Sequence, residues 1–151
     1  MQRIFLWHCS KCSFHFEAYG PKECTINNDS KKPKIQELRS NKSDRSDGLF
    51  VHGFCKTCKK EVDVIILELK KPGNPWNIKK DDIKSEYLEN YNEHFLTNHN
   101  QDTISADEYS TNSLKCPICD TNILFYPDIS EYHLCPICRK GQLEMVGELI
   151  K

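Results

Sequence analysis

Leu114-Lys-Cys-Pro-Ile-Cys119 and Leu134-Cys-Pro-Ile-Cys138 are near copies of one another. In each, two residues between the cysteines allow a tight turn, or knuckle, to direct both sulfurs at one point, where turn amides can donate hydrogen bonds to them. Fifteen residues separate Cys119 from Cys135, which fits the C-x₂-C-x₁₅₋₂₀-C-x₂-C zinc pattern. The spacing predicts that these two knuckles face each other across one metal ion.

Two further knuckles lie in the amino-terminal half, at Cys9-Ser-Lys-Cys12 and Cys55-Lys-Thr-Cys58, with forty-two residues between them. Aromatic residues precede both knuckles, and the strands expected around them look like the two halves of one small antiparallel ribbon. This local symmetry predicts that they share a second ion. Another pairing, such as the Cys9 knuckle with the Cys116 knuckle, stays open, because doubling a loop costs only about 0.6 kcal/mol. The predicted ligands are Cys9, Cys12, Cys55, Cys58, Cys116, Cys119, Cys135 and Cys138.

The repeated Cys-Pro-Ile-Cys stretch resembles the zinc-ribbon family with its rubredoxin-like knuckles, over residues 114–150 and less closely over residues 3–69. Rubredoxin knuckles usually place glycine after the second cysteine, whereas this chain has Asp120 and Arg139 there. That difference disfavours iron, and Gly141 is expected to supply the positive-φ turn. The resemblance implies small antiparallel ribbons held by four-cysteine zinc sites, in proteins that often serve transcription, replication or translation assemblies.

The choice of metal follows from the ligands. Four thiolates in a tetrahedron suit Zn²⁺ best and iron second. Disulfides or redox dithiols are the competing interpretation of the same pairs, but no secretory signal is recognisable at Met1–His8, and such pairs in a reducing compartment are usually metal or redox sites. We expect two structural Zn²⁺ ions and a cytoplasmic protein.

The expected fold class is α+β: two zinc-stabilised ribbons joined by one helix. The first ribbon spans residues 1–73 with a loop insertion at about 25–48, and strands are expected at Arg3–His8, Phe14–Tyr19, Leu49–Phe54 and Val62–Leu69. A helix from Lys80 to Asn98 occupies the segment 74–100, with an apolar stripe that includes Ile83 and Tyr87. Residues 101–113 are interpreted as a linker, and 114–151 as the second ribbon, with strands at 123–126, 132–134 and 143–150.

The charge is unevenly distributed, although its sum is −1. Residues 1–73 contain fourteen Lys and Arg against nine Asp and Glu, and residues 74–114 contain three against eight. Such a balance predicts poor nonspecific binding to polyanions by the chain as a whole, while a local nucleic-acid site remains open. No run of eighteen apolar residues occurs, so no membrane span is expected.

The remaining metal-type side chains are interpreted as structural. His8 and His15 are expected on a strand surface, and His94 and His99 are five apart and do not share a helix face. His133 is too marginal to replace a cysteine ligand, and Cys24 is expected to be a plain, partly buried thiol.

No catalytic motif is recognisable, and eight paired cysteines leave no open position on a metal. We expect a non-enzymatic adaptor that binds a protein or nucleoprotein partner, with no small-molecule substrate. Two alternatives remain open. One is direct nucleic-acid binding through the basic amino-terminal half; the other is a thiol redox or metal-transfer protein.

Overall fold

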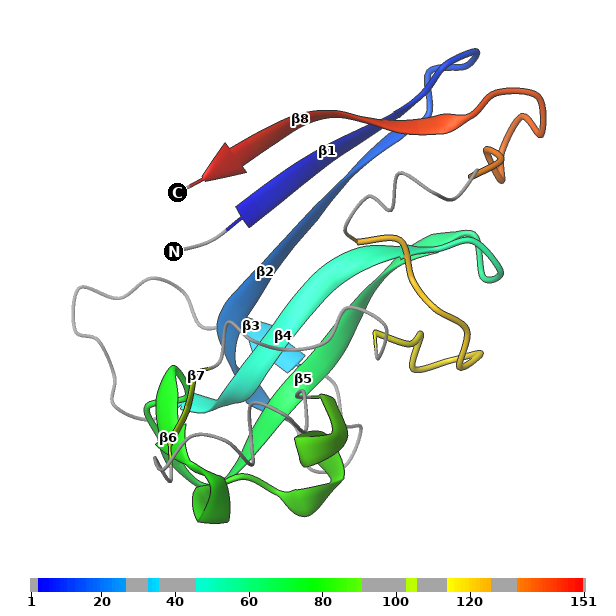
Figure 1. Ribbon diagram of the computed structural model, residues 1–151. Coiled ribbons are helices and arrows are strands. Elements are labelled where there is room, and N and C mark those ends of the chain that lie inside the picture. Colours follow the sequence, from blue (N-terminus) through cyan, green and yellow to red (C-terminus); the bar gives the residue numbers. More distant parts are fainter. Residues whose placement is uncertain are drawn as a thin grey trace. The chain divides into compact units, whose positions relative to one another are not determined.

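The computed structural model describes residues 3–26, 33–35, 46–90, 103–105, 114–125 and 133–150 (Figure 1). Within these residues the regular structure is almost entirely β. The strands are β1 (Arg3–Cys9), β2 (His15–Ile26), β3 (Pro33–Ile35), β4 (Ser46–Cys55), β5 (Lys60–Gly73), β6 (Asn77–Lys79), β7 (Thr103–Ser105) and β8 (Leu143–Ile150).

Five of the strands form the path β5-β4-β2-β1-β8 of one sheet, and β3 pairs with β2 outside this path. β1 is antiparallel to β2 on one side and to β8 on the other, so the first and last strands of the chain are neighbours. The register shifts between Leu6 and Trp7, and Val146 lies opposite this irregularity, 64% exposed. β6 and β7 form a separate two-stranded sheet.

The strands of the sequence analysis are largely confirmed, because alternation of apolar and polar residues marks them clearly. β1 and β8 lie where they were expected, and β2 continues past Gly20 and Pro21 to Ile26. Gly20 has a φ of 136°, which only glycine adopts without strain. In 114–125 and 133–142, isolated bridges replace the short strands that were predicted.

The predicted α+β class is wrong, because no α-helix joins two ribbons within the described residues. The segment expected to be helical contains two short 3₁₀ helices, η1 (Lys80–Asp82) and η2 (Ser85–Asn90). Ile83 lies between them and forms a bridge with Leu69, which removes it from any continuous helix. The remainder of the predicted helix, 91–98, lies outside the described residues, as does the linker apart from β7.

The chain divides into two compact units. Unit 1 comprises Met1–Gly20, Val51–Val64 and Lys115–Lys151, and unit 2 comprises Pro21–Phe50 and Ile65–Leu114. No described helix is long and apolar enough to cross a membrane.

Aromatic side chains form the core of unit 1. Trp7 stacks on Phe16 with ring centroids 5.6 Å apart, and Phe16 stacks on Phe54 at 5.1 Å. The indole Nε1 of Trp7 donates a hydrogen bond to the carbonyl of Phe125 at 3.2 Å. These contacts connect β1, β2 and β4 to the segment 114–125, which comes from the far end of the sequence.

Unit 2 has an aliphatic core with one buried carboxylate. Leu49, Ile66 and Leu67 are fully buried there. Glu68 is 3% exposed, and its oxygens meet the Lys84 ammonium and the Tyr87 hydroxyl. The 3₁₀ segment is thereby attached to β5 through a paired charge, since an unpaired buried carboxylate would be costly. Cys24 is fully buried in this unit, more deeply than expected.

Candidate metal centres

The structure brings the eight predicted ligands into two groups of four sulfurs, both in unit 1. Site I consists of Cys9, Cys12, Cys135 and Cys138, and site II of Cys55, Cys58, Cys116 and Cys119. In each site all four sulfurs lie within 4.8 Å of one another. Each site therefore combines one knuckle from the amino-terminal half with one Cys-Pro-Ile-Cys knuckle.

The predicted pairing of knuckles is wrong. The two Cys-Pro-Ile-Cys knuckles do not face each other, and the two amino-terminal knuckles do not share a site. The reason is the strand order. β8 pairs with β1, and Cys9 is the register partner of Leu143, so the 135–138 knuckle lies beside the 9–12 knuckle. Phe54 forms a bridge with Leu124, with N–O distances of 3.0 and 2.8 Å, so the 116–119 knuckle lies beside the 55–58 knuckle.

The sulfur–sulfur distances fit a tetrahedral zinc ion. At a Zn–S distance of about 2.3 Å, tetrahedral sulfurs are about 3.8 Å apart. In site I, Cys9 and Cys138 are 3.6 Å apart and Cys12 and Cys135 are 3.8 Å apart. In site II, Cys55–Cys119 is 3.4 Å and Cys58–Cys116 is 3.9 Å. These separations are much longer than the S–S bond of a disulfide, about 2.0 Å.

Backbone amides surround the sulfurs, as the knuckle spacing predicts. The amides of Lys11 and Cys12 donate to Cys9 Sγ at 3.4 Å, and the amide of Gly141 donates to Cys138 Sγ at 3.3 Å. Cys58 and Ile118 donate in the same way to Cys55 and Cys116, each at 3.4 Å. Such hydrogen bonds stabilise the thiolate form, which is the form that binds metal.

Hydrogen bonds and neighbouring sulfurs shift the thiol pKa values in opposite directions. Hydrogen bonds from the Thr121 hydroxyl and backbone lower the pKa of Cys119 to about 6, and the amides of Lys140 and Gly141 lower that of Cys138 to about 6. Hydrogen bonding to Cys119, burial and the other neighbouring sulfurs raise the pKa of Cys58 to about 12. Four sulfurs this close cannot all be anionic without a positive ion between them.

The turn after three of the knuckles is left-handed without glycine. Lys59, Asp120 and Arg139 have φ values of 57°, 63° and 58°. The expectation that Gly141 would supply the positive φ is therefore wrong for this knuckle. Gly141 is required for another reason: a Cβ there would collide with Cys9 Sγ and lie 3.0 Å from the Lys11 amide nitrogen.

None of the described histidines belongs to either group of four sulfurs. His8 and His15 are exposed register partners on β1 and β2, as expected. His133 is buried edge-on against Trp7, and its Nδ1 lies 3.4 Å from Lys56 Nζ. His94 and His99 lie outside the described residues.

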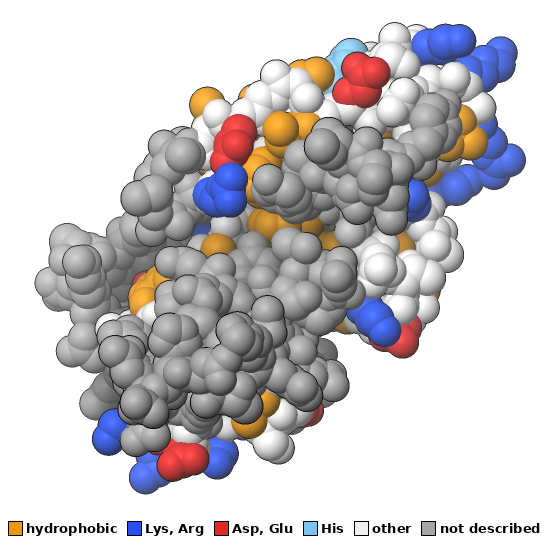
Figure 2. Space-filling view, viewed as in Figure 1, with side chains coloured by type: hydrophobic (Ala, Val, Ile, Leu, Met, Phe, Trp, Pro, Cys, Tyr) orange, Lys and Arg blue, Asp and Glu red, His pale blue; other side chains and the backbone are white. Residues whose placement is uncertain are grey.

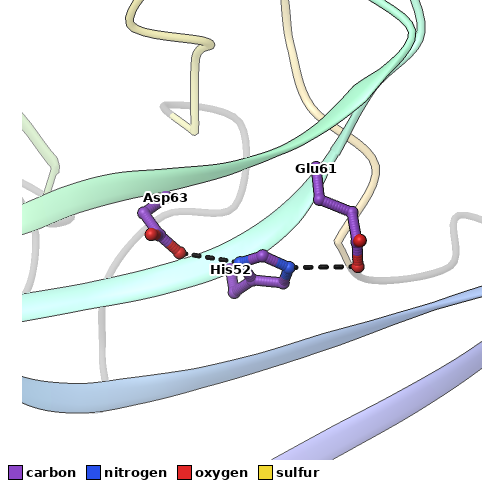
Figure 3. Close-up of polar contacts among 3 residues, drawn as sticks. All are labelled: His52, Glu61 and Asp63. Carbon is purple, nitrogen blue, oxygen red and sulfur yellow. Dashed lines mark hydrogen bonds and ion pairs between the residues drawn. The ribbon is translucent and has the colours of Figure 1, made fainter. Parts of the chain in front are cut away.

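Sequence reasoning missed one polar cluster on the β4–β5 hairpin, which Figure 3 shows. His52 Nδ1 lies 2.7 Å from Asp63 Oδ1, and His52 Nε2 lies 3.2 Å from Glu61 Oε1. Tyr19 stacks on the imidazole with centroids 4.7 Å apart. Burial lowers the pKa of His52, but hydrogen bonds to Asp63 and Glu61 outweigh this effect, and the pKa is raised. Glu61 and Asp63 are two residues apart, and this spacing could have indicated that both carboxylates lie on one face of a strand.

Comparison with protein-family models, with curated proteins and with solved structures finds no match for this chain.

Proposed function

We propose that this chain is a non-enzymatic adaptor in which two structural zinc ions hold the knuckles in place for docking onto a protein or nucleoprotein partner. The observation that carries the proposal is the closed set of four cysteine sulfurs in each site. A catalytic zinc ion usually has three protein ligands and one open position for water or substrate. Four thiolates leave no such position.

The knuckle tips support a docking role. Ile118 and Ile137 occupy the same place in the two Cys-Pro-Ile-Cys knuckles, and they are 62% and 55% exposed. Folding around a metal gives these side chains fixed positions that a short loop would not otherwise hold, because structural zinc contributes on the order of 10–16 kcal/mol in small zinc-finger peptides. Apolar side chains presented in this way are typical of contact surfaces.

The presence of two zinc ions bound by cysteine thiolates is tested by metal analysis of the purified protein together with thiol titration under denaturing conditions. We expect two zinc ions per chain and nine titratable thiols, and cooperative unfolding on treatment with a chelator. Cys24→Ala is the matched control, since Cys24 lies in unit 2 outside both groups; it should retain both ions and lose one thiol. Metal-free protein that is folded, or cysteines recovered as cystine, would overturn the proposal.

Docking is tested by crosslinking in extracts of the native source, with Ile118→Ser/Ile137→Ser as the variant. The double variant should keep two zinc ions and lose the crosslinked partners that the unaltered chain captures. Rapid zinc release on mild oxidation, with full reversal by reductant, would instead favour the thiol redox or metal-transfer alternative.

A further inference from the structure

Cationic side chains gather at the four knuckles of unit 1. Each lies within a knuckle or at most two residues from one of its cysteines. They come from both halves of the chain, so their common location is visible only in the folded structure. We call this group the knuckle surface: Lys11, Lys56, Lys59, Lys60, Lys115, Arg139 and Lys140. All are exposed except Lys56, which is half-buried.

Both metal sites lie at one end of the sheet in unit 1. The tips of the β1–β2 and β4–β5 hairpins point the same way (Figure 1). Phe14, in the first tip, contacts the ring of Phe54 just before the second, with centroids 5.0 Å apart. Figure 2 shows Lys and Arg side chains concentrated where the β1–β2 tip and the chain leading into β8 lie.

The described acidic side chains of unit 1 do not neutralise this end. Glu148 binds Arg3 at 2.7 Å, near the start of β1, and Glu61 and Asp63 bind His52. Glu17 and Glu144 are exposed on β2 and β8, opposite Leu6 and His8 of β1. Asp120 is the one described acidic residue inside a knuckle turn. Within the described part of unit 1, positive charge is thus concentrated at the knuckles and negative charge lies along the strands.

Apolar groups are interspersed with the cations. Ile118 and Ile137 are exposed, and Phe14 is half-buried between the two hairpin tips. Phosphate binding needs only the cations, whereas the unstacked bases of a single strand also need apolar contacts; the ring of Phe14 can stack on a base, and the isoleucines add apolar surface beside it. This mixture fits a single strand better than a duplex, whose bases are stacked inside, and better than a purely acidic peptide such as polyglutamate, which offers no ring faces.

We propose that the knuckle surface binds single-stranded nucleic acid, with its lysines and arginine on the phosphates and its apolar side chains against bases. The inference rests on the proposed function, because the zinc ions must hold the knuckles together for the cations to converge. It also specifies that function by naming the class of partner. The weak overall charge is no obstacle, since affinity depends on the phosphates neutralised locally.

The test measures binding of the zinc-loaded full chain to a fluorescent oligothymidylate of about 16 nucleotides, a length that spans one binding site of this kind. Lys11→Gln/Lys60→Gln/Lys140→Gln removes three knuckle cations without introducing acids beside the thiolates. Because each phosphate contact on a single strand contributes about 0.7 to the salt slope, the variant should lower that slope by about 2 and weaken binding at least about tenfold at about 50 mM salt.

The matched control is Lys70→Gln/Lys71→Gln/Lys79→Gln, which removes the same charge from exposed positions in unit 2. It should change affinity by less than about twofold. An equal loss in both triple variants, tighter binding of a duplex or a polyglutamate peptide, or no binding at about 50 mM salt would overturn the inference. If these failures occur in protein that carries two zinc ions and unfolds cooperatively, the adaptor proposal stands and only the nucleic-acid partner is lost.

Discussion

Site I and site II are built on one plan but secured by different contacts. Each takes one knuckle from a hairpin of long strands, β1–β2 or β4–β5, and one Cys-Pro-Ile-Cys knuckle from the carboxyl-terminal segments. In site I the backbone of Gly141 is pressed against Cys9 Sγ, where no side chain fits. In site II the Thr121 hydroxyl lies 3.0 Å from Cys119 Sγ and 3.7 Å from Cys55 Sγ.

Similar knuckles in this chain therefore have equivalent roles without being partners. The two Cys-Pro-Ile-Cys copies each complete a separate site. Both knuckles are closed by the same backbone hydrogen bond. The amide of Asp120 donates to the carbonyl oxygen of Cys116 at 2.9 Å, and the amide of Arg139 donates to the carbonyl oxygen of Cys135 at 3.0 Å. Site I is distinguished by the close packing at Gly141 and site II by the side-chain hydroxyl of Thr121, so the two sites should respond differently to substitution.

The largest expected effect concerns the pairing itself. Replacing all cysteines of 9–12 and 135–138 by serine should empty site I and leave one zinc ion that resists a competing chelator. Replacing those of 9–12 and 55–58 instead should leave no such ion, because each site then loses half of its ligands. The measurement is zinc per chain after gel filtration with chelator. The reverse pattern would restore the pairing of neighbouring knuckles.

This pairing is what the sequence could not determine. The sulfurs nearest in sequence across site I are 123 residues apart and those across site II are 58 apart. The predicted partners, Cys12 with Cys55 and Cys119 with Cys135, are only 43 and 16 residues apart. Loop closure therefore favours the wrong pairing by about 2 kcal/mol, and pairing between distant strands outweighs this cost. The ligands themselves were predictable, because the two-residue spacing is a property of each turn alone.

The strands show the same division between local and distant information. The alternation of apolar and polar residues around Trp7, Phe16 and Val62 predicts strands, because this period-2 pattern depends only on neighbouring residues in the sequence. No pattern near Leu143 or Cys9 in the sequence predicts that these two residues pair.

The predicted helix is wrong for a related reason. Ile83 and Tyr87 fit a helical stripe, but Ile83 pairs with Leu69, and the Tyr87 hydroxyl donates a hydrogen bond to Glu68 on β5. Contacts with a distant strand outweighed local propensity.

The second prediction tests the packing of site I. Gly141→Ala would place a methyl group against Cys9 Sγ and the 9–12 knuckle, and overpacking of this kind costs about 1–3 kcal/mol. Zinc affinity of site I should therefore fall by about 10–100-fold, as measured by competition with a chromogenic chelator. Gly147→Ala is the control, because its methyl group would meet Leu6 Cδ1 at an ordinary 3.4 Å. Equal affinities in the two variants would contradict this account of site I.

The third prediction tests the polar contact of site II. Thr121→Val removes the hydroxyl beside Cys119 Sγ while keeping a similar shape. Loss of an outer hydrogen bond to a metal ligand typically lowers affinity by about 10–100-fold, and we expect the lower end here because Thr121 is exposed. Release of one of the two zinc ions should be faster, with the other unchanged. Thr121→Ser retains a hydroxyl and should restore slow release; failure to do so would assign the effect to packing.

The smallest expected effect concerns the hairpin that carries site II. His52 on β4 is held by Asp63 and Glu61 of β5, and these hydrogen bonds raise its pKa against the opposing effect of burial. A folded-state pKa above the unfolded value of about 6.5 means that the extra stability is complete below that pH. It is lost as pH rises through the raised pKa. For a partly exposed pair the contribution should be below about 1 kcal/mol.

Chemical unfolding of the zinc-loaded protein between about pH 6 and 8 measures this effect, with Asp63→Asn as the comparison. Zinc binding weakens in acid because the thiolates protonate, so it opposes the His52 contribution in every variant. The difference between the unaltered chain and Asp63→Asn isolates the imidazole. That difference should shrink as pH rises, and a constant difference would show that Asp63 stabilises the hairpin independently of the charge on His52.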